Sequence, residues 1–328
     1  MIVPDFKPFE GQHCETTATG SLLKHLGIDL SEPMLFGLGQ GLGFIYWDMP
    51  RLMTFPFLGG RIKQDELTQN LCRNLGLNLE GKETSSVKSA WKNVKEKIDQ
   101  EIPVGIKLDC YHLDYFTEKI HFAGHYVAMY GYDDTYAYLV DTQQQESIVK
   151  ATLKNLELAR NEKGPMSSRN LSYSISKSGA VPDLKEIIPA AIKRNATDFL
   201  NPPIKNVGYK GIEKTSQTIR NWFDRSSDKS EYELAASLME NGGTGGALFR
   251  NLYRDFLRES LKHVPSQELE LGCEMYTQIA PMWNEVSTLI GKAGQSFDQK
   301  YLDQSSGMLS EISKREKEAM EILSRIEQ

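Results

Sequence analysis

The most informative stretch of this chain is Cys14-Glu-Thr-Thr-Ala-Thr-Gly-Ser-Leu-Leu-Lys-His-Leu26. It places Ala18, Leu22 and Leu26 on one side of a helix, and the next residue is a glycine, which commonly ends a helix. The predicted helix begins at Cys14. Unbonded backbone N–H groups and the helix dipole stabilise negative charge at such a start, which favours the nucleophilic thiolate. Cys14 is therefore the candidate nucleophile, and a buried structural cysteine is the alternative.

A predicted β-hairpin supplies candidate partners for this thiol. Its strands, 126–132 and 136–140, flank the turn-like Asp133-Asp-Thr135. An odd-length loop centred on Asp133 would set His125 directly opposite Asp141, with Cβ atoms about 5 Å apart on one face. The carboxylate would then orient an imidazole that serves the thiolate. A two-residue turn at Asp133-Asp134 would instead turn Asp141 away, and a surface hairpin with an exposed His and Asp is the simpler alternative.

The first half of the chain reads as mixed helix and strand, and helical periodicity takes over from about residue 181. We expect an α+β fold with an antiparallel sheet in an N-terminal domain, residues 1–178, followed by a mainly α-helical domain, residues 179–328. Asp183 and Glu186 resemble a capping box at the first helix of the second domain. Further strands are expected at 103–108, 146–150 and 171–176, and further helices at 84–99, 209–224, 231–240, 247–263, 267–290 and 300–326.

Composition limits the class of protein. The chain has 328 residues, 40% of them hydrophobic and 25% charged, as in ordinary globular proteins. A net charge of -6 without a basic block argues against nucleic acid as the main partner. No apolar run approaches the roughly 18 residues of a membrane span, and the N-terminus has no signal pattern. Four scattered cysteines without a CxxC pair indicate free thiols and no zinc site. We therefore expect a cytoplasmic protein that binds neither metal nor membrane.

Other residues offer rival sites. Cys110 and His112 would share a face of a strand and form a second nucleophile and base, although nothing nearby favours the thiolate. The spacing of His121 and His125 does not align two imidazoles for a metal in a loop-to-strand segment. Gly242-Gly-Thr-Gly-Gly246 precedes a helix with Arg250 but lacks the ending of a P-loop. A phosphate or carboxylate site there competes with simple tight packing at a helix entry.

Several motifs together resemble one family. They are Gly11-Gln-His-Cys-Glu15, Ser31-Glu-Pro-Met-Leu-Phe-Gly-Leu-Gly-Gln-Gly-Leu-Gly-Phe44, His121-Phe-Ala-Gly-His-Tyr-Val-Ala-Met-Tyr-Gly-Tyr-Asp133, Asn201-Pro-Pro203 and Gly242-Gly-Thr-Gly-Gly-Ala-Leu-Phe-Arg250. The chain is similar to the butirosin biosynthesis protein H family. Its N-terminal domain looks like the papain-like double-glycine peptidases that process bacteriocin leaders, and its helical part looks like the family's companion C-terminal domain.

This resemblance implies an activity. Cys14 would take up an acyl group as a thioester, with His125 as general base and Asp141 as its orienting partner. The family's best-known donor is an acyl carrier protein, and the acceptor is an amine on an aminoglycoside. No cofactor of the chain's own is implied, because the donor protein carries the phosphopantetheine.

The resemblance also bears on the oxyanion and the substrate. The related peptidases place a glutamine six residues before the cysteine to stabilise the oxyanion, but Pro8 occupies that position here. We expect Gln12 and the Cys14 N–H to take its place. The residues expected to contact substrate are His13, Asp109, Tyr111, Gly124 and Arg250.

Two other functions remain open. A cysteine peptidase or amidase would use the same triad with water as acceptor, and a non-catalytic binding protein would retain the fold without a reactive Cys14. The C-terminal run Glu311–Gln328 alternates acidic and basic residues, which is typical of a solvated helix face and leaves a homodimer contact open.

Overall fold

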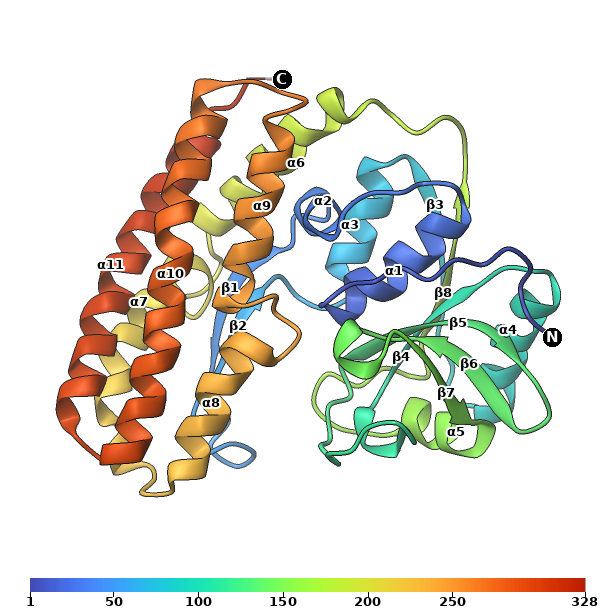
Figure 1. Cartoon of the computed structure of the whole chain (residues 1–328), viewed down its shortest axis with the longest axis horizontal. Helices are drawn as coiled ribbons and strands as arrows, with labels where there is room; N and C mark the ends of the chain where they lie inside the picture. The colour runs from blue at the N-terminus through green and yellow to red at the C-terminus, as the bar shows by residue number, and fades with distance from the viewer. Residues whose placement is uncertain (328) are drawn as a thin grey trace. The chain divides into compact units, whose positions relative to one another are not determined.

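The computed structural model describes residues 1–327, which divide into two compact units (Figure 1). Unit 1 comprises Met1–Leu35 and Gln64–Pro182, and unit 2 comprises Phe36–Lys63 and the chain from Asp183 onward. This division corrects the expectation of one unbroken N-terminal domain over residues 1–178. The segment Phe36–Lys63 belongs with the helical C-terminal part instead.

The hydrogen bonds of the Phe36–Lys63 segment explain this assignment. Its strands, β1 (Leu42–Trp47) and β2 (Phe57–Arg61), form a separate two-stranded antiparallel sheet. The Asn195 side chain donates to the Leu42 carbonyl at 2.8 Å, and the Tyr46 N–H donates to the Asn206 carbonyl at 2.8 Å. Backbone groups of β1 thus form hydrogen bonds with residues of the C-terminal part. Local periodicity in the sequence does not indicate such long-range hydrogen bonds.

Unit 1 is built on a six-stranded sheet with strand order β3-β8-β4-β5-β6-β7, in which every neighbouring pair is antiparallel (Figure 1). The strands are β3 (Leu77–Lys82), β4 (Val104–Leu108), β5 (His125–Tyr132), β6 (Tyr136–Val140), β7 (Ile148–Thr152) and β8 (Ser172–Lys177).

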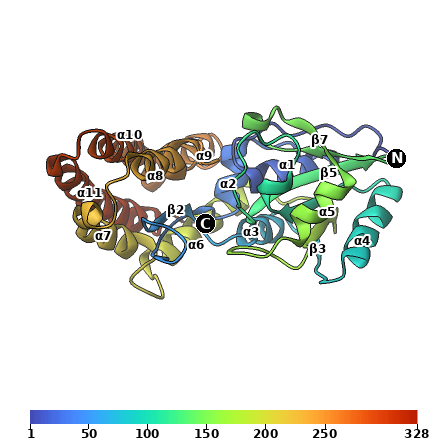
Figure 2. The same cartoon turned by 90° about the horizontal axis from the view of Figure 1, so that it is seen from below.

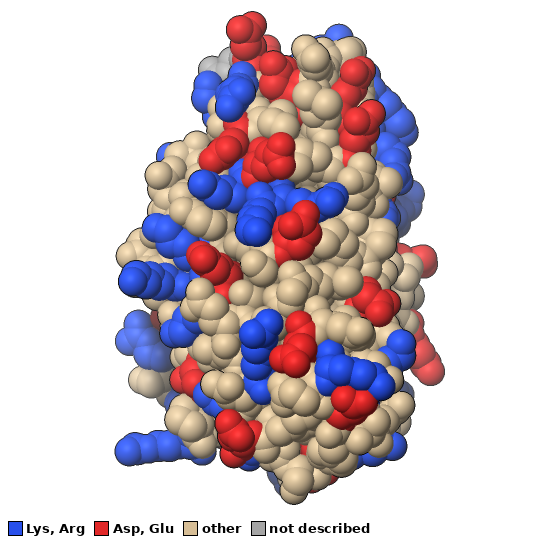
Figure 3. Space-filling view, turned by 90° about the vertical axis from the view of Figure 1, so that its left-hand side faces the viewer, with Lys and Arg blue, Asp and Glu red and all other residues tan. Residues whose placement is uncertain are grey.

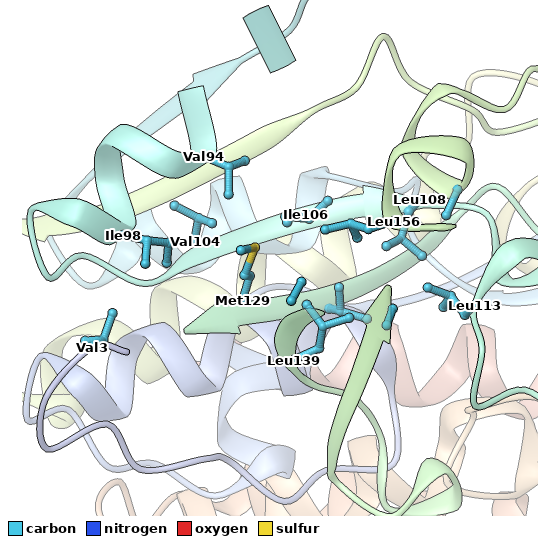
Figure 4. Packing of buried hydrophobic residues seen from close by; sticks show 14 residues of the cluster. Val3, Val94, Ile98, Val104, Ile106, Leu108, Leu113, Met129, Leu139 and Leu156 are labelled. Atoms are coloured by element: carbon cyan, nitrogen blue, oxygen red, sulfur yellow. The ribbon is translucent and has the colours of Figure 1, made fainter. Parts of the chain in front are cut away.

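Helices cover both faces of this sheet. They are α1 (Cys14–His25), α3 (Glu66–Asn74), α4 (Val87–Asp99) and α5 (Leu153–Asn161), with short 3-10 turns η1 (Cys110–His112) and η2 (Gln143–Gln145); α2 (Glu32–Leu38) runs across the division of the chain. One sheet face carries Ile106, Val127 and Met129 among other apolar residues, and α4 and α5 pack on it with α1 on the other side (Figure 4). Strand alternation directs these side chains to one face, and the predicted helix at 84–99 contributes Val94 and Ile98.

Unit 2 is mainly helical, as expected. The helices are α6 (Leu184–Leu200), α7 (Gly208–Thr218), α8 (Lys229–Asn241), α9 (Arg250–Ser260), α10 (Gln267–Ser296) and α11 (Gln299–Leu323), with 3-10 turns η3 (Ile219–Asp224) and η4 (Ala247–Phe249). Asp183 caps α6, since its carboxylate accepts the Lys185 N–H at 2.9 Å. Figure 2 views α7, α8, α10 and α11 nearly end-on, and shows α10 beside α11.

The outer surface of α11 carries paired charges. Arg315 bonds Glu311 at 2.7 Å, and Lys317 lies 3.6 Å from Glu321. Figure 3 shows basic and acidic side chains interspersed over the face that it presents. A solvated helix face is the arrangement expected from the alternating charges of this run. No helix within residues 1–327 combines the length and the apolar character needed to cross a membrane.

Candidate active site

Cys14 is the first residue of α1, as predicted, and its side chain is 8% exposed. The helix cap is unusual, because the N-cap residue His13 makes no capping hydrogen bond with its side chain. The Glu32 carboxylate from another element instead holds the residues that lead into the helix. It accepts the N–H groups of Gln12 at 2.9 Å and His13 at 2.8 Å, together with the Thr16 hydroxyl at 2.7 Å.

Glu32 and Gly11 together fix the backbone that leads into Cys14. Burial raises the pKa of Glu32, and its hydrogen bonds to Gln12, His13 and Thr16 act in the opposite direction. A Cβ at Gly11 would lie 2.5 Å from the Thr17 hydroxyl and 2.9 Å from Glu32 Oε1, so only glycine fits. Sequence reasoning missed Glu32, because nothing in its spacing from Cys14 marks it as a partner of the segment before the helix.

His125 and Asp141 meet, but not in the predicted register. His125 Nε2 lies 2.8 Å from Asp141 Oδ2, and the two side chains are 8% and 0% exposed. The hairpin closes where the Asp133 N–H donates to the Tyr136 carbonyl at 2.9 Å, so the loop has two residues, Asp134 and Thr135. The expected odd-length loop centred on Asp133 is therefore wrong, and so is the direct pairing of His125 with Asp141.

A β-bulge produces the contact instead. Gly131 pairs with Tyr138, whereas Met129 pairs with Leu139, so Tyr130 is an extra residue in β5. Continued past Val140, the shifted register sets Asp141 opposite residue 127, which shares a sheet face with His125. Without the bulge, the pairing would move by one residue and Asp141 would point to the other face. The bulge thus accounts for an acid–base pair that the observed two-residue turn alone would not have formed.

Two further donors hold the Asp141 carboxylate. The Tyr115 hydroxyl donates to Oδ2 at 2.8 Å, and the Thr142 N–H donates to Oδ1 at 2.6 Å. The ring of Phe116 meets the His125 ring edge-on, with centroids 5.5 Å apart. Sequence reasoning missed Tyr115 and Phe116, since both lie in an irregular segment after η1 where periodicity gives no signal.

The Cys110 thiol lies beside the His125 side chain. Cys110 interacts with the His125 side chain, and it interacts electrostatically with Cys14 as well. Burial disfavours the charged imidazolium, but the interactions with Asp141 and Cys110 together outweigh it and raise the pKa of His125 well above its usual value. Burial raises the pKa of the Cys110 thiol, and His125 only partly opposes this. The His125–Asp141 pair therefore favours a proton on the imidazole.

A main-chain hydrogen bond joins the two halves of the site. The Gln143 N–H donates to the Gly11 carbonyl at 2.9 Å, which ties the segment after Asp141 to the segment before Cys14. Helix α1 also packs mainly on β5, the strand that begins with His125. The fold thus brings Cys14, His125 and Asp141 into one region of unit 1.

The rival pair of Cys110 and His112 does not form. These residues lie in the 3-10 turn η1 rather than on a strand, and His112 Nε2 bonds Glu162 at 2.7 Å. All four cysteines are free and buried, which agrees with the expected thiols. Within residues 1–327, no group of three or more His, Cys, Asp or Glu side chains is arranged to hold a metal ion.

The other predicted substrate contacts of unit 1 lie in two places. Asp109 is buried at the end of β4, where it accepts the Tyr111 N–H at 2.8 Å and lies 3.4 Å from His121. Tyr111 is 38% exposed and stacks on His121 with ring centroids 4.0 Å apart. A Cβ at Gly124 would lie 2.0 Å from the end of the Gln64 side chain, which would have to move to accommodate it. These residues adjoin Cys110 and His125 in the chain.

At the helix start, His13 is buried and the Gln12 side chain is exposed. The Gln12 N–H donates to Glu32, so it is the side chain that stays available for an oxyanion. The roles expected for Gln12, His13, Asp109, Tyr111 and Gly124 remain predictions.

The expectation that Arg250 contacts substrate is wrong. Its side chain is 0% exposed, and its Nε and Nη2 bond the two oxygens of Glu316 at 2.7 and 2.8 Å. Nη1 donates to the carbonyls of Leu248 and Gly60 at 2.7 and 3.2 Å. The guanidinium therefore stabilises the turn Ala247–Phe249, whose residues have φ of 51°, 48° and 74°. Left-handed backbone of this kind is strained for residues other than glycine.

The comparisons with known proteins agree with the motifs. The family model described as "Butirosin biosynthesis protein H, N-terminal" matches residues 13–142, and a domain of unknown function (DUF4872) matches residues 154–323. The chain belongs to the butirosin biosynthesis protein H family. The expected α+β fold class, with an antiparallel sheet in the first part of the chain and a mainly helical second part, is confirmed.

Two solved structures are also similar to this family member. The peptidase domain of Streptococcus ComA, a bi-functional ABC transporter involved in quorum sensing, is 11% identical; the match covers 53% of this chain and 99% of that one, with a TM-score of 0.34. A putative C39-like peptidase from Bacillus anthracis is 17% identical, with 54% and 98% covered and a TM-score of 0.37. Comparison with curated proteins gives no match.

Proposed function

We propose that this protein is a cysteine-dependent acyltransferase that moves an acyl group from a thioester donor, through an acyl-Cys14 intermediate, to an amine. The observation that carries the proposal is the buried 2.8 Å contact of His125 with Asp141 in the unit where Cys14 begins a helix. A thiol at a helix start, an imidazole and an orienting carboxylate are the parts that nucleophilic acyl transfer requires.

The first half-reaction loads Cys14. The Cys14 thiolate attacks the thioester carbonyl, the carbon–sulfur bond to the donor breaks, and the imidazolium of His125 protonates the departing thiolate. The bond that breaks in the donor and the bond that forms on Cys14 are both thioesters, so this exchange changes the free energy little. The Cys14 N–H, with the exposed side chain of Gln12, is the oxyanion donor that we propose.

The second half-reaction releases the acyl group. An amine attacks the acyl-cysteine, His125 accepts its proton, and the amide leaves with Cys14 returned to the thiolate. Amide formation from a thioester is downhill. Asp141 keeps its charge throughout and stabilises the imidazolium of each step.

Of the two thiols Cys14 and Cys110, Cys14 is the better nucleophile in this proposal. It lies at the start of a twelve-residue helix, where backbone dipoles favour a thiolate. Cys110 lies in a three-residue turn, and its burial favours the neutral thiol. Cys110 therefore donates a hydrogen bond to the imidazole in our account, and Cys14 receives the acyl group.

The donor and acceptor follow from the family. We propose an acyl carrier protein or a comparable thioester as donor, and an amine-bearing intermediate of specialised metabolism, aminoglycoside-like or peptide-like, as acceptor. The donor would bring its own phosphopantetheine, and the reaction would take place in the cytoplasm. The stacked Tyr111 and His121 beside buried Asp109 are the surface that we assign to the amine, because a carboxylate and an aromatic face both attract a cation.

Intact-protein mass spectrometry with a panel of acyl thioesters tests this proposal. We expect an acyl adduct on the wild type and none on Cys14→Ala, and we expect added amines to discharge it faster than buffer alone. Discharge at the same rate by water would replace the proposal with a hydrolase acting on peptides or amides. No adduct across the panel, with slow alkylation of Cys14, would indicate a non-catalytic binding protein.

A further inference from the structure

The Asp141 carboxylate has a second partner besides His125, and it comes from a different part of the chain. Tyr115 lies in the segment between η1 and β5, and its hydroxyl donates to Asp141 Oδ2 at 2.8 Å. This is the same oxygen that His125 Nε2 approaches at 2.8 Å. We propose that Tyr115 is a positioning residue that fixes the Asp141 carboxylate and, through it, the ring of His125.

The carboxylate needs such a restraint. Asp141 follows the last residue of β6, so the strand pairing does not hold its side chain. Its Oδ1 is bonded to the N–H of the adjacent Thr142 at 2.6 Å. A bond between neighbours in the chain leaves the carboxylate plane free to rotate. The Tyr115 hydroxyl, which belongs to another segment, removes this freedom and keeps Oδ2 directed at His125.

The shared oxygen also limits the basicity that His125 can reach. A hydroxyl that donates to Oδ2 takes part of the negative charge that would otherwise stabilise the imidazolium. The hydroxyl remains a donor, because burial and Asp141 raise the pKa of Tyr115 well above its usual value. The other titratable groups around the pair are Cys110 of η1, Cys14 of α1 beyond it, and Asp114 next to Tyr115. None of these donates to Oδ2 in the described residues.

This inference rests on the proposed function but has a readout that does not depend on catalysis. NMR titration of the labelled histidines gives the pKa of His125 directly. We expect Tyr115→Phe to raise it and Asp141→Asn to lower it. A side chain that merely fills space would leave the pKa of His125 unchanged, since Phe keeps the ring of Tyr115.

Tyr138→Phe is the matched control. Tyr138 belongs to the same sheet, and its hydroxyl donates to a carboxylate, Asp133 Oδ2, at 2.6 Å in the exposed hairpin turn. This variant should leave the titration of His125 and the rate of Cys14 acylation at wild-type values. In Tyr115→Phe we expect kcat of acyl transfer to fall about tenfold, as for the loss of one hydrogen bond to a charged group, with KM unchanged.

A second variant covers the case in which Tyr115→Phe does not fold. Incorporation of 3-fluorotyrosine at position 115 keeps the shape of the ring and makes the hydroxyl a stronger donor, so the pKa of His125 should fall. Shifts of opposite sign for Phe and fluorotyrosine would support a positioning role. An unchanged His125 titration in either folded variant would overturn it, while a missing acyl adduct on the wild type would refute only the proposed reaction.

Discussion

His125–Asp141 in unit 1 and Arg250–Glu316 in unit 2 are both buried pairs of a basic and an acidic side chain, but their polar groups have different partners. Arg250 donates hydrogen bonds from Nε, Nη1 and Nη2 to Glu316 and to two carbonyls of its own unit. Trp283 also donates to Glu316. His125 Nε2 contacts Asp141, and the His125 side chain also interacts with the Cys110 thiol. Both pairs are nearly inaccessible, so burial alone does not distinguish them.

The difference separates a buried charged pair that stabilises the fold from one that can take part in a reaction. A pair whose donors and acceptors are all satisfied by its own unit can stabilise a strained turn but has nothing left for a ligand. A pair with a group directed at a nucleophile can pass a proton to a substrate. Variants of the His125–Asp141 pair should therefore change the rate of acyl transfer, and variants of the Arg250–Glu316 pair should change the free energy of unfolding.

Replacing His125 should affect chemistry most strongly. We expect His125→Ala to slow the loading of Cys14 about 100- to 10,000-fold, because a general acid–base group contributes a factor of this size. The rate of adduct formation by mass spectrometry measures this. His112→Ala is the control, since His112 is bonded to Glu162 and should change the rate less than about twofold. An equal loss in both variants would revive the rival pair of Cys110 and His112.

Breaking the Arg250–Glu316 pair should instead affect folding. Arg250→Met leaves the Glu316 carboxylate buried without its counter-ion, which costs about 3–5 kcal/mol. Urea denaturation followed by fluorescence measures the loss in the free energy of unfolding. The double variant Arg250→Met with Glu316→Leu should recover most of it, because no uncompensated charge then remains. A loss below about 1 kcal/mol in the single variant would contradict the structural role.

The pH dependence of stability should separate Asp141→Asn from the wild type. The pKa of His125 is raised in the folded state, so its pairing with Asp141 contributes fully below the unfolded value of about 6.5 and is lost as pH rises through the folded value. Without the carboxylate, burial favours neutral imidazole, and stability should rise with pH over the same range. Urea midpoints between pH 5 and 9 test this, and parallel curves would contradict the assigned pairing.

An exposed pair should show the smallest effect. Arg315 and Glu311 are spaced by four residues on α11 with side chains about half exposed. Glu311→Gln should cost no more than about 0.5 kcal/mol and should lose even this effect in high salt. A cost comparable to that of Arg250→Met would mean that exposure is a poor guide to the importance of these pairs.

Local sequence signals predicted much of the secondary structure and part of the site. Helix periodicity and the glycine that follows placed Cys14 at a helix start, and strand alternation gave the hairpin that carries His125 and Asp141. The bulge at Tyr130 was not predictable, because an extra residue in one strand depends on both strands of the sheet. The correct partner was therefore expected from an incorrect turn.

Long-range contacts account for the other misses. Glu32 reaches the helix start of Cys14 from a separate element, and Tyr115 reaches Asp141 from an irregular segment. Arg250 looked available because a glycine-rich loop preceded it, and its buried partner Glu316 lies 66 residues away in the chain. The segment Phe36–Lys63 was placed in the wrong unit for a similar reason, since the groups that bond β1 come from the C-terminal part.

Peptide mapping of the trapped acyl group tests the central claim most directly. Wild-type protein is loaded with a reactive acyl thioester, quenched in acid and digested, and the peptides that contain Cys14 and Cys110 are compared. We predict that the acyl group is on Cys14 alone, and that Cys110→Ala still loads while His125→Ala does not. An acyl group on Cys110, or full loading without His125, would contradict the account.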